Sequence, residues 1–180
     1  DADDVCLPGR FERQLEWLRD ASTMTLCGTR VETFGDGVQS GRVRYERWLN
    51  RLTSHEAMAR ERFIECPIAH PTFMAHRACF ERIGYADGDL PEDYDLVLRA
   101  HDAGVHFVKV PETLLRWRDH SARACLNDAR YSAEAFRRLK RRHLAPLLGG
   151  GRRFWQWGAG EVGKAWLRAW EDARPERVVD

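Results

Sequence analysis

Strand patterns and helical patterns follow one another along the chain, and this order restricts the fold to classes that mix both kinds of element. Residues 24–34 alternate apolar side chains with Thr and Cys, as strands do, and residues 105–110 form a second, shorter apolar segment. Between them, the pattern over 91–103 predicts a helix that ends at Gly104, a favourable C-cap. We therefore expect an α/β fold.

Further helices are predicted over 8–20, 45–52, 54–62, 77–83, 131–148 and 162–173. Further strands are predicted over 113–117, 154–157 and 177–180. Pro111 is expected to end the strand that begins at Val105, because proline lacks the N–H that a sheet ladder needs. Residues 63–71 hold two prolines and cannot form one regular element, residues 118–127 predict a loop, and the glycines at 149–151 predict a linker.

Composition excludes several classes of protein. The 180 residues are 43% hydrophobic and 11% aromatic, which is enough for a sizeable core. The 29 basic and 28 acidic residues leave a net charge of +1, so a strongly basic nucleic-acid binder is not expected. The five cysteines are odd in number and form no C-x-x-C pair, which indicates free thiols in the cytoplasm rather than a disulfide framework or a structural zinc site.

The acidic run D-A-D-D contains Asp1, Asp3 and Asp4. Closely spaced carboxylates in a loop are ligands that a hard divalent cation such as Mg²⁺ or Mn²⁺ prefers, and the cation can then bridge to phosphate oxygens. The alternative is a solvated acidic segment that only favours the dipole of the following helix.

A second acidic run, P-E-D-Y-D, opens the helix predicted over 91–103. A carboxylate at this place, Asp93, can act as a general base if it faces a cleft. The alternative is structural, because Asp89 can serve as an N-cap with Glu92 at the N3 position of a capping box.

Two further segments carry polar residues beside apolar ones. In W-R-D-H-S, at the end of a predicted strand, His120 can ligate a metal and Arg118 can contact phosphate, or both are simply solvated. In C-P-I-A-H-P-T, His70 and Thr72 lie in an irregular apolar segment that is either a pocket wall or a crossing through the core.

Three segments follow one another along the chain: DADDVCLPGRFERQLEWL, ECPIAHPTFMAHRACFERIGYAD and LPEDYDLVLRAHDAGVHFVKVPETLLRWRDH. Together they resemble the family 2 glycosyltransferases over about residues 1–125. The resemblance implies a GT-A-like fold, the α/β sandwich of nucleotide-diphospho-sugar transferases. It also implies that a nucleotide-binding half precedes Asp1. We therefore expect this chain to be a fragment that is inactive by itself.

The resemblance also implies a reaction and a set of site residues. The reaction is inverting transfer of a sugar from a nucleotide-diphospho-sugar to a hydroxyl of a carbohydrate or lipid-linked acceptor, as in the assembly of cell-envelope polysaccharide. The family's D-x-D motif, which binds a divalent cation (Mg²⁺ or Mn²⁺), falls on Asp1 and Asp3, with His120 nearby. The family's E-D motif falls on Glu92 and Asp93, with Asp93 as the base. The diphosphate would lie near Arg118, and the acceptor near His70 and Thr72.

A glycine motif, G-A-G-E-V-G, lies between a predicted strand and a predicted helix. Gly158, Gly160 and Gly163 match the dinucleotide-binding fingerprint, and Asp180 ends the next predicted strand, where an acid can bind a ribose hydroxyl. The motif predicts the start of a Rossmann-like βαβ unit. It is either a turn that binds nothing or, as an alternative function for the chain, the site of a non-catalytic nucleotide- or dinucleotide-binding module.

The expected division is therefore residues 1–130 for the cation and acceptor part of a transferase, 131–151 for a helix and linker, and 152–180 for the truncated βαβ start. The helix predicted over 131–148 is strongly basic. Its charges predict a solvated surface, with peripheral contact to anionic lipid at the inner face of the membrane as the alternative. A third hypothesis for the whole chain is a non-catalytic scaffold that does not depend on metal.

Overall fold

The computed structural model describes residues 2–36, 38–148, 152–170 and 174–180, which form two compact units. Unit 1 comprises Asp1–Gly88 and Glu92–Asn127, and unit 2 comprises Asp89–Pro91 and Asp128–Asp180. Both units mix helices and strands, so the expected α/β class is confirmed. The predicted glycine linker at 149–151 lies outside the described residues, and the division predicted from the sequence stays a prediction.

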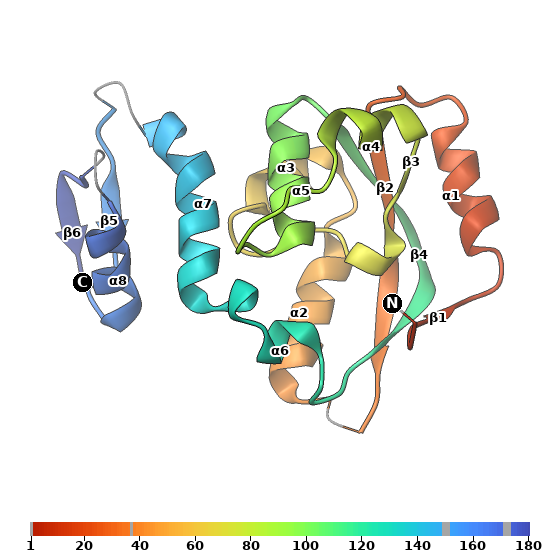
Figure 1. The fold of residues 1–180 in the computed structure, drawn as a ribbon, viewed down its shortest axis with the longest axis horizontal. Helices are drawn as coiled ribbons and strands as arrows, with labels where there is room; N and C mark the ends of the chain where they lie inside the picture. Colours follow the sequence, from red (N-terminus) through yellow and green to blue (C-terminus); the bar gives the residue numbers. More distant parts are fainter. Residues whose placement is uncertain (1, 37, 149–151, 171–173) are drawn as a thin grey trace. The chain divides into compact units, whose positions relative to one another are not determined.

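Unit 1 is built on a four-stranded sheet with the strand order β1-β4-β2-β3 (Figure 1). Its strands are β1 (Val5–Cys6), β2 (Thr25–Phe34), β3 (Met74–Ala75) and β4 (His106–Arg118). The two long strands, β2 and β4, run parallel, and the two short strands pair antiparallel at the outer edges. The parallel pair therefore carries the sheet, and the functional segments follow its ends.

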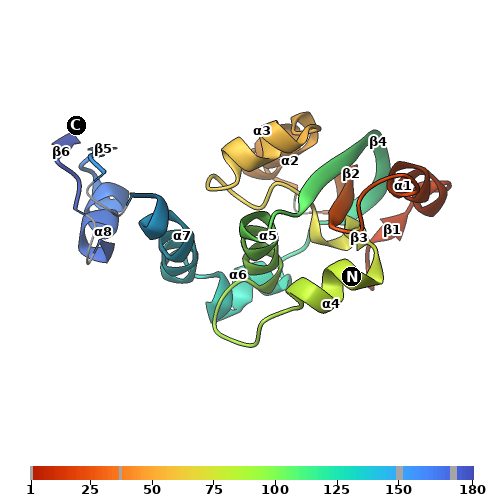
Figure 2. The same ribbon diagram turned by 90° about the horizontal axis from the view of Figure 1, so that it is seen from above.

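Helices cover both faces of this sheet (Figure 2). The helices of unit 1 are α1 (Arg10–Leu18), α2 (Ser40–Arg51), α3 (His55–Glu61), α4 (Arg77–Ile83), α5 (Glu92–Asp102) and α6 (Ala124–Asn127), with a 3-10 turn η1 (His70–Thr72). Under α1, Leu18 packs with Cys27 and Val110. Under α2, Leu49 packs with Val31 and Leu115. Two apolar clusters therefore hold the sheet between its helices.

The strand break expected at Pro111 is wrong, because β4 continues through this residue to Arg118. The register against β2 shifts on either side of Arg30, so the residues around Pro111 form a bulge rather than a regular ladder. β1 pairs only with Leu115 and Arg116 at the far end of β4. The missing N–H of Pro111 therefore removes no ladder hydrogen bond, and a proline is tolerated at a bulge.

One helix takes the place of a neighbouring strand along part of β2. Asn50 of α2 accepts a hydrogen bond from the backbone N–H of Val31 (3.0 Å) and donates one to its carbonyl (2.8 Å). One turn earlier, Glu46 accepts from the N–H of Thr33 (2.7 Å). Side chains four residues apart share one face of a helix. This face of α2 is therefore fixed to the backbone of β2 where β3 does not reach.

Unit 2 contains η2 (Ala129–Tyr131), α7 (Ala133–Leu148), β5 (Trp155–Trp157), α8 (Glu161–Ala169) and β6 (Arg177–Val179). The strands β5 and β6 are parallel and are joined through α8, so the predicted βαβ unit is confirmed. The helix predicted over 131–148 begins two residues later, because Ala129–Tyr131 forms the separate turn η2. The helix predicted over 162–173 is observed as α8, and Ala173 lies outside the described residues.

Candidate functional site

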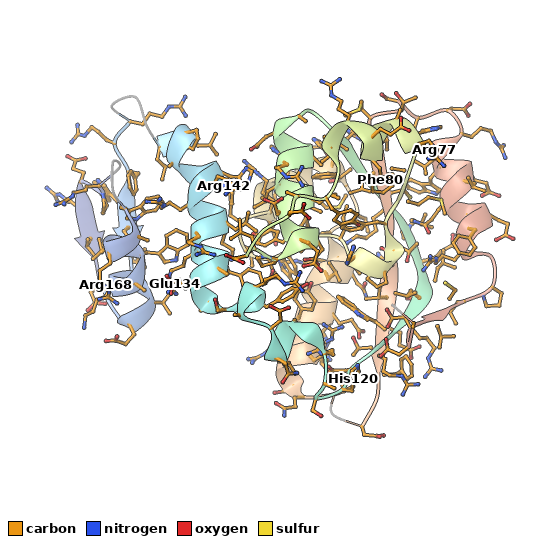
Figure 3. All side chains as sticks on the ribbon, viewed as in Figure 1. Arg77, Phe80, His120, Glu134, Arg142 and Arg168 are labelled. Atoms are coloured by element: carbon orange, nitrogen blue, oxygen red, sulfur yellow. The ribbon has the colours of Figure 1, made fainter. Side chains whose placement is uncertain are left out.

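The acidic turn near the start of the chain meets the end of β4. The carboxylate Oδ2 of Asp3 lies 3.0 Å from Nε2 of His120, and both side chains are about two-fifths exposed (41% and 40%). Asp4 accepts a hydrogen bond from the backbone N–H of Arg118 (2.9 Å), and Arg118 Nε donates to the carbonyl of Asp3 (3.2 Å). Figure 3 shows His120 at the end of unit 1 where β4 leads towards α6. The structure thus brings Asp3 together with Arg118 and His120, which come from a second motif far along the chain.

The segment that carries His120 is fixed by a close approach of two backbones. The N–H of Asp119 donates to the carbonyl of Phe34 (2.7 Å), so the ends of β4 and β2 meet. Gly35 follows with φ +130°, and a Cβ at this position would overlap the carbonyl oxygen of Asp119. Only glycine fits here, because any side chain would strain the backbone and collide with it.

Gly35→Ala is therefore expected to lower the free energy of unfolding by roughly 1–3 kcal/mol, the cost of a strained backbone position. Urea denaturation measures this loss. Gly41→Ala is the matched control, because an added Cβ in this helical position meets nothing within 4 Å. Alanine is the better helix former, so the control variant should be as stable as the unaltered chain or slightly more stable. Equal stability of the two variants would contradict the close approach.

Asp93 lies at the start of α5, a helix whose middle is buried. Its Oδ1 accepts a hydrogen bond from the backbone N–H of Tyr94 (2.8 Å). Burial raises the pKa of Asp93, while the positive charge of His70 acts in the opposite direction and favours the carboxylate. A carboxylate whose pKa is raised is a stronger base than an ordinary one.

The capping-box alternative for this segment is wrong. It requires Asp89 to cap a helix that begins at Leu90, but α5 begins at Glu92. Glu92 and Asp93 are therefore the first two residues of the helix, where negative charge is favoured by the helix dipole.

The segment predicted to lie on the acceptor side forms η1. Nε2 of His70 lies 2.8 Å from the hydroxyl of Tyr85, and its ring packs edge-on against Phe73 with the ring centroids 5.1 Å apart. Thr72, by contrast, is fully buried, and its hydroxyl donates to the carbonyl of Ala69 (2.7 Å). His70 is therefore placed to meet a ligand, whereas burial argues against direct contact by Thr72, whose assignment stays a prediction.

Three buried or nearly buried polar side chains hold the segment around η1 in place. Lys109 of β4 donates from Nζ to the carbonyls of Leu49 (2.7 Å) and Pro67 (2.8 Å), and burial lowers its pKa to about 7. On the other side, Gln14 of α1 donates to the carbonyl of Thr72 (2.8 Å). In the same way, Arg10 of α1 donates to the carbonyl of Pro71 (2.9 Å). The loop that carries His70 is therefore held by hydrogen bonds from side chains on both faces of the sheet.

Tyr45 of α2 lies near the strand end that leads to His120. Burial raises its pKa, and the negative charge of Asp93 is among the groups that act on it. The ring of Tyr45 also packs near that of Trp117, with the centroids 6.4 Å apart. Trp117 directly precedes Arg118 and the turn to His120. This ring contact therefore places Tyr45 beside the strand end that leads to His120.

The side chains of Asp3 and His120 provide some of the ligands that a divalent cation needs. Carboxylate oxygen and imidazole nitrogen are both ligands that Mn²⁺ accepts, and phosphate oxygens of a substrate would have to complete the shell. Within the described parts of the chain, no group of three or more His, Cys, Asp or Glu side chains is arranged to hold a metal ion. Asp1, the other predicted ligand, lies outside the described residues.

The glycine motif forms the expected turn between β5 and α8. Gly158 adopts φ +96°, and a Cβ on Gly163 would overlap the carbonyl oxygen of Gly158, so the helix and the turn need glycine to approach each other. Gly160 is the N-cap residue of α8. Asp180 accepts a hydrogen bond from the backbone N–H of Ala159 (3.3 Å). This geometry matches the strand-turn-helix context of the fingerprint, and a bound cofactor stays a prediction.

The basic helix α7 buries Ala135, Leu139 and His143, and most of its charges lie on the rest of its surface. Its predicted contact with lipid stays a prediction. None of the helices in the described parts of the chain is both long enough and apolar enough to cross a bilayer. The thiols of Cys27, Cys66 and Cys79 are free and buried, and those of Cys6 and Cys125 are free and exposed, so the expectation of free thiols is confirmed.

The sequence analysis missed Tyr45, Tyr85 and Lys109. A lone lysine in the apolar run V-H-F-V-K-V was a usable signal, because an unpaired charge inside a buried strand requires partners. The two tyrosines gave no such signal, since aromatic residues in helices and loops are usually part of the core.

The chain is similar to two curated glycosyltransferases. An "uncharacterized glycosyltransferase" of Haemophilus influenzae is 27% identical over 154 residues, which cover 83% of this chain and 56% of that protein. The "O-antigen biosynthesis glycosyltransferase WbnJ" of Escherichia coli is 29% identical over 157 residues, which cover 82% of this chain and 58% of that protein. No family model matches the chain, and no solved structure matches it significantly. The chain thus spans somewhat more than half the length of these curated relatives, and the similarity supports a glycosyltransferase.

Proposed function

We propose that this chain supplies the cation-binding and acceptor-binding part of an inverting glycosyltransferase of family 2 with a GT-A-like fold. The observation that carries the proposal is the pairing of Asp3 with His120 at 3.0 Å, in the same unit as the partly buried Asp93. An inverting transfer needs these two functions, one that stabilises the departing diphosphate and one that deprotonates the acceptor hydroxyl. Similarity to two curated glycosyltransferases supports the same conclusion.

In this proposal the acidic turn and the end of β4 bind the diphosphate side of the donor, a nucleotide-diphospho-sugar. Asp3 and His120 would hold Mg²⁺ or Mn²⁺, with Asp1 as a further ligand. A cation bound there would neutralise the charge that develops on the leaving diphosphate. Arg118 would contact the phosphate groups, because its guanidinium is already fixed beside this turn by Asp3 and by the ring of Phe34.

Asp93 would accept the proton of the acceptor hydroxyl as that oxygen attacks the sugar. Its raised pKa makes the carboxylate a stronger base, and the charge of His70 keeps the carboxylate form available. His70 and Tyr85 would then position the acceptor from the η1 side. Glu92 would contribute through the charge that it adds beside Asp93.

The name of the Escherichia coli relative suggests the acceptor class. We propose a carbohydrate or lipid-linked acceptor in the assembly of a cell-envelope polysaccharide, with transfer on the cytoplasmic side. The free thiols favour a reducing compartment. Contact of the basic helix α7 with anionic lipid would bring a lipid-linked acceptor close to the enzyme.

Binding of Mn²⁺ in the presence of UDP tests the cation site. Paramagnetic resonance of free Mn²⁺ measures it in this chain and in any longer form of the protein. Asp3→Asn and His120→Ala are each expected to weaken binding at least tenfold, because each removes one of the three proposed protein ligands. Asp20→Asn is the matched control, since this exposed carboxylate follows α1 and should not affect the cation.

Two outcomes would contradict the proposal. Unchanged Mn²⁺ binding by Asp3→Asn would remove this residue from the cation site. If the protein instead binds a nicotinamide dinucleotide and no Mn²⁺ with UDP, the loop with Gly158, Gly160 and Gly163 is the working site. The chain would then be a nucleotide-binding module, the alternative that the parallel βαβ geometry of unit 2 supports.

A further inference from the structure

A row of polar side chains runs along α2, and its first member lacks a hydrogen-bond acceptor among the described residues. Arg42, Glu46 and Asn50 are spaced four residues apart and therefore share one face of the helix. Glu46 and Asn50 bind the backbone of β2 at Thr33 and Val31. Arg42 continues the row towards the ends of β2 and β4, and it forms no hydrogen bond or ion pair with the described residues.

The guanidinium of Arg42 is held in place by aromatic rings. It stacks on Trp117 with 4.0 Å between the central carbon and the ring centroid, and it lies 5.4 Å from the centroid of Tyr45. Two of its nitrogens, Nε and Nη2, are buried without an acceptor among the described residues. A buried charged donor without an acceptor costs free energy, so this arrangement is unfavourable unless a ligand completes it.

The charged side chains around Arg42 do not supply the missing acceptor. Burial lowers the pKa of Arg42, and the neighbouring Arg123 lowers it further. Asp119 acts in the opposite direction, but its Oδ1 lies 2.9 Å from Nε of Arg123 and so pairs with that residue instead. The described groups near Arg42 therefore leave a positive charge unneutralised.

We propose that Arg42 binds an oxyanion, a phosphate or carboxylate group of the substrate. A guanidinium offers two parallel N–H donors to such a group, and a partly buried site strengthens the interaction. Arg42 as a whole remains partly exposed, so a small anion can reach it. The stacking on Trp117 fixes its orientation before the ligand binds. Its contact with Trp117 places Arg42 beside the strand end that leads to the turn with His120.

Binding of two probe anions, inorganic pyrophosphate and glucuronate, tests this inference. Both are titrated into the isotope-labelled chain in EDTA, and the Nε–Hε signal of Arg42 is followed by NMR. Arg42→Met is expected to weaken binding of the responding anion at least tenfold. Arg44→Met is the matched control, because Arg44 is exposed on the same helix and its loss changes the net charge equally. A response to pyrophosphate alone identifies a phosphate group as the ligand, and a response to glucuronate alone identifies an acidic sugar.

The inference is overturned if Arg42→Met and Arg44→Met bind both anions equally, or if the unaltered chain binds neither. Circular dichroism shows whether Arg42→Met folds. If it does not fold, Arg42→Lys replaces it, because lysine keeps the charge but loses the fork of donors. Weaker binding by the folded Arg42→Lys supports the inference, and unchanged binding contradicts it.

Only the identity of the ligand as a transferase substrate rests on the proposed function. The anion titration contains no divalent cation and measures no transfer. Loss of anion binding in Arg42→Met together with unchanged Mn²⁺ binding in Asp3→Asn would therefore uphold this site and contradict the proposed cation site. The reverse result would contradict Arg42 alone.

Discussion

Replacing Asp93 with Asn is expected to lower the rate of glycosyl transfer by roughly 10²–10⁴-fold, the range for loss of a general base. An amide has the shape of the carboxyl but cannot accept the proton of the acceptor hydroxyl. The rate is measured as release of the nucleoside diphosphate, in the form of the protein that shows transfer. Mn²⁺ binding with UDP should not change, because Asp93 is proposed to act on the acceptor and not on the cation.

Asp93 should also determine how the rate of transfer depends on pH. The base acts only when Asp93 is ionised, so the rate should rise with pH through its pKa, which burial raises above the ordinary range of a carboxyl. His70 opposes this shift, so His70→Ala should move the rising limb of the pH profile to still higher pH.

Asp102→Asn is the matched control, since Asp102 is exposed at the other end of α5. Transfer by Asp93→Asn at the rate of the control would exclude Asp93 as the base. A reduced rate with an unshifted profile in His70→Ala would restrict His70 to binding the acceptor.

The second large effect concerns stability and depends on Lys109. Burial lowers its pKa from 10.5 to about 7 in the folded chain. Below this pH the amine is charged in both states and gives no pH dependence. Between about pH 7 and 10.5 the unfolded chain binds a proton that the folded chain does not, so stability increases with pH. The slope is at most about 1.4 kcal/mol per pH unit.

Lys109→Met removes this titration. The difference in unfolding free energy between the unaltered chain and Lys109→Met should therefore grow by roughly 3 kcal/mol from pH 7 to 9.5, in favour of the unaltered chain. Urea denaturation at several pH values measures it, and other titrating groups cancel in the difference. Lys164→Met is the matched control, because the Lys164 side chain is 56% exposed. A difference that does not change with pH would contradict the low pKa.

The local elements were predictable because each depends on neighbouring residues. The helix over 77–83 is observed with the predicted bounds, and the βαβ unit at the C-terminal end follows from its glycines and flanking strand patterns. The error at Pro111 has a tertiary cause. Proline ends a strand in a regular ladder, but here the register of β4 against β2 forms a bulge, which the sequence of β4 alone does not specify.

The candidate site was predictable where its residues belong to motifs. Asp3 and His120 each belong to a recognisable motif, the family resemblance predicted that they lie near each other, and the pairing of β1 with β4 explains how they meet. Arg42 belongs to no motif. Its position follows from the fixation of α2 on the backbone of β2, and side-chain bonds of this kind between distant segments leave no periodic pattern in the sequence.

The attachment of α2 to β2 also has a consequence for self-association. An unpaired strand edge is a template on which another chain can add a strand. Asn50 and Glu46 already occupy the backbone groups of Val31 and Thr33 that such a chain would need. Release of α2 would therefore expose unpaired backbone groups of β2 to other chains without unfolding the sheet. Substitutions at these two helical positions should promote aggregation more than their modest effect on stability suggests.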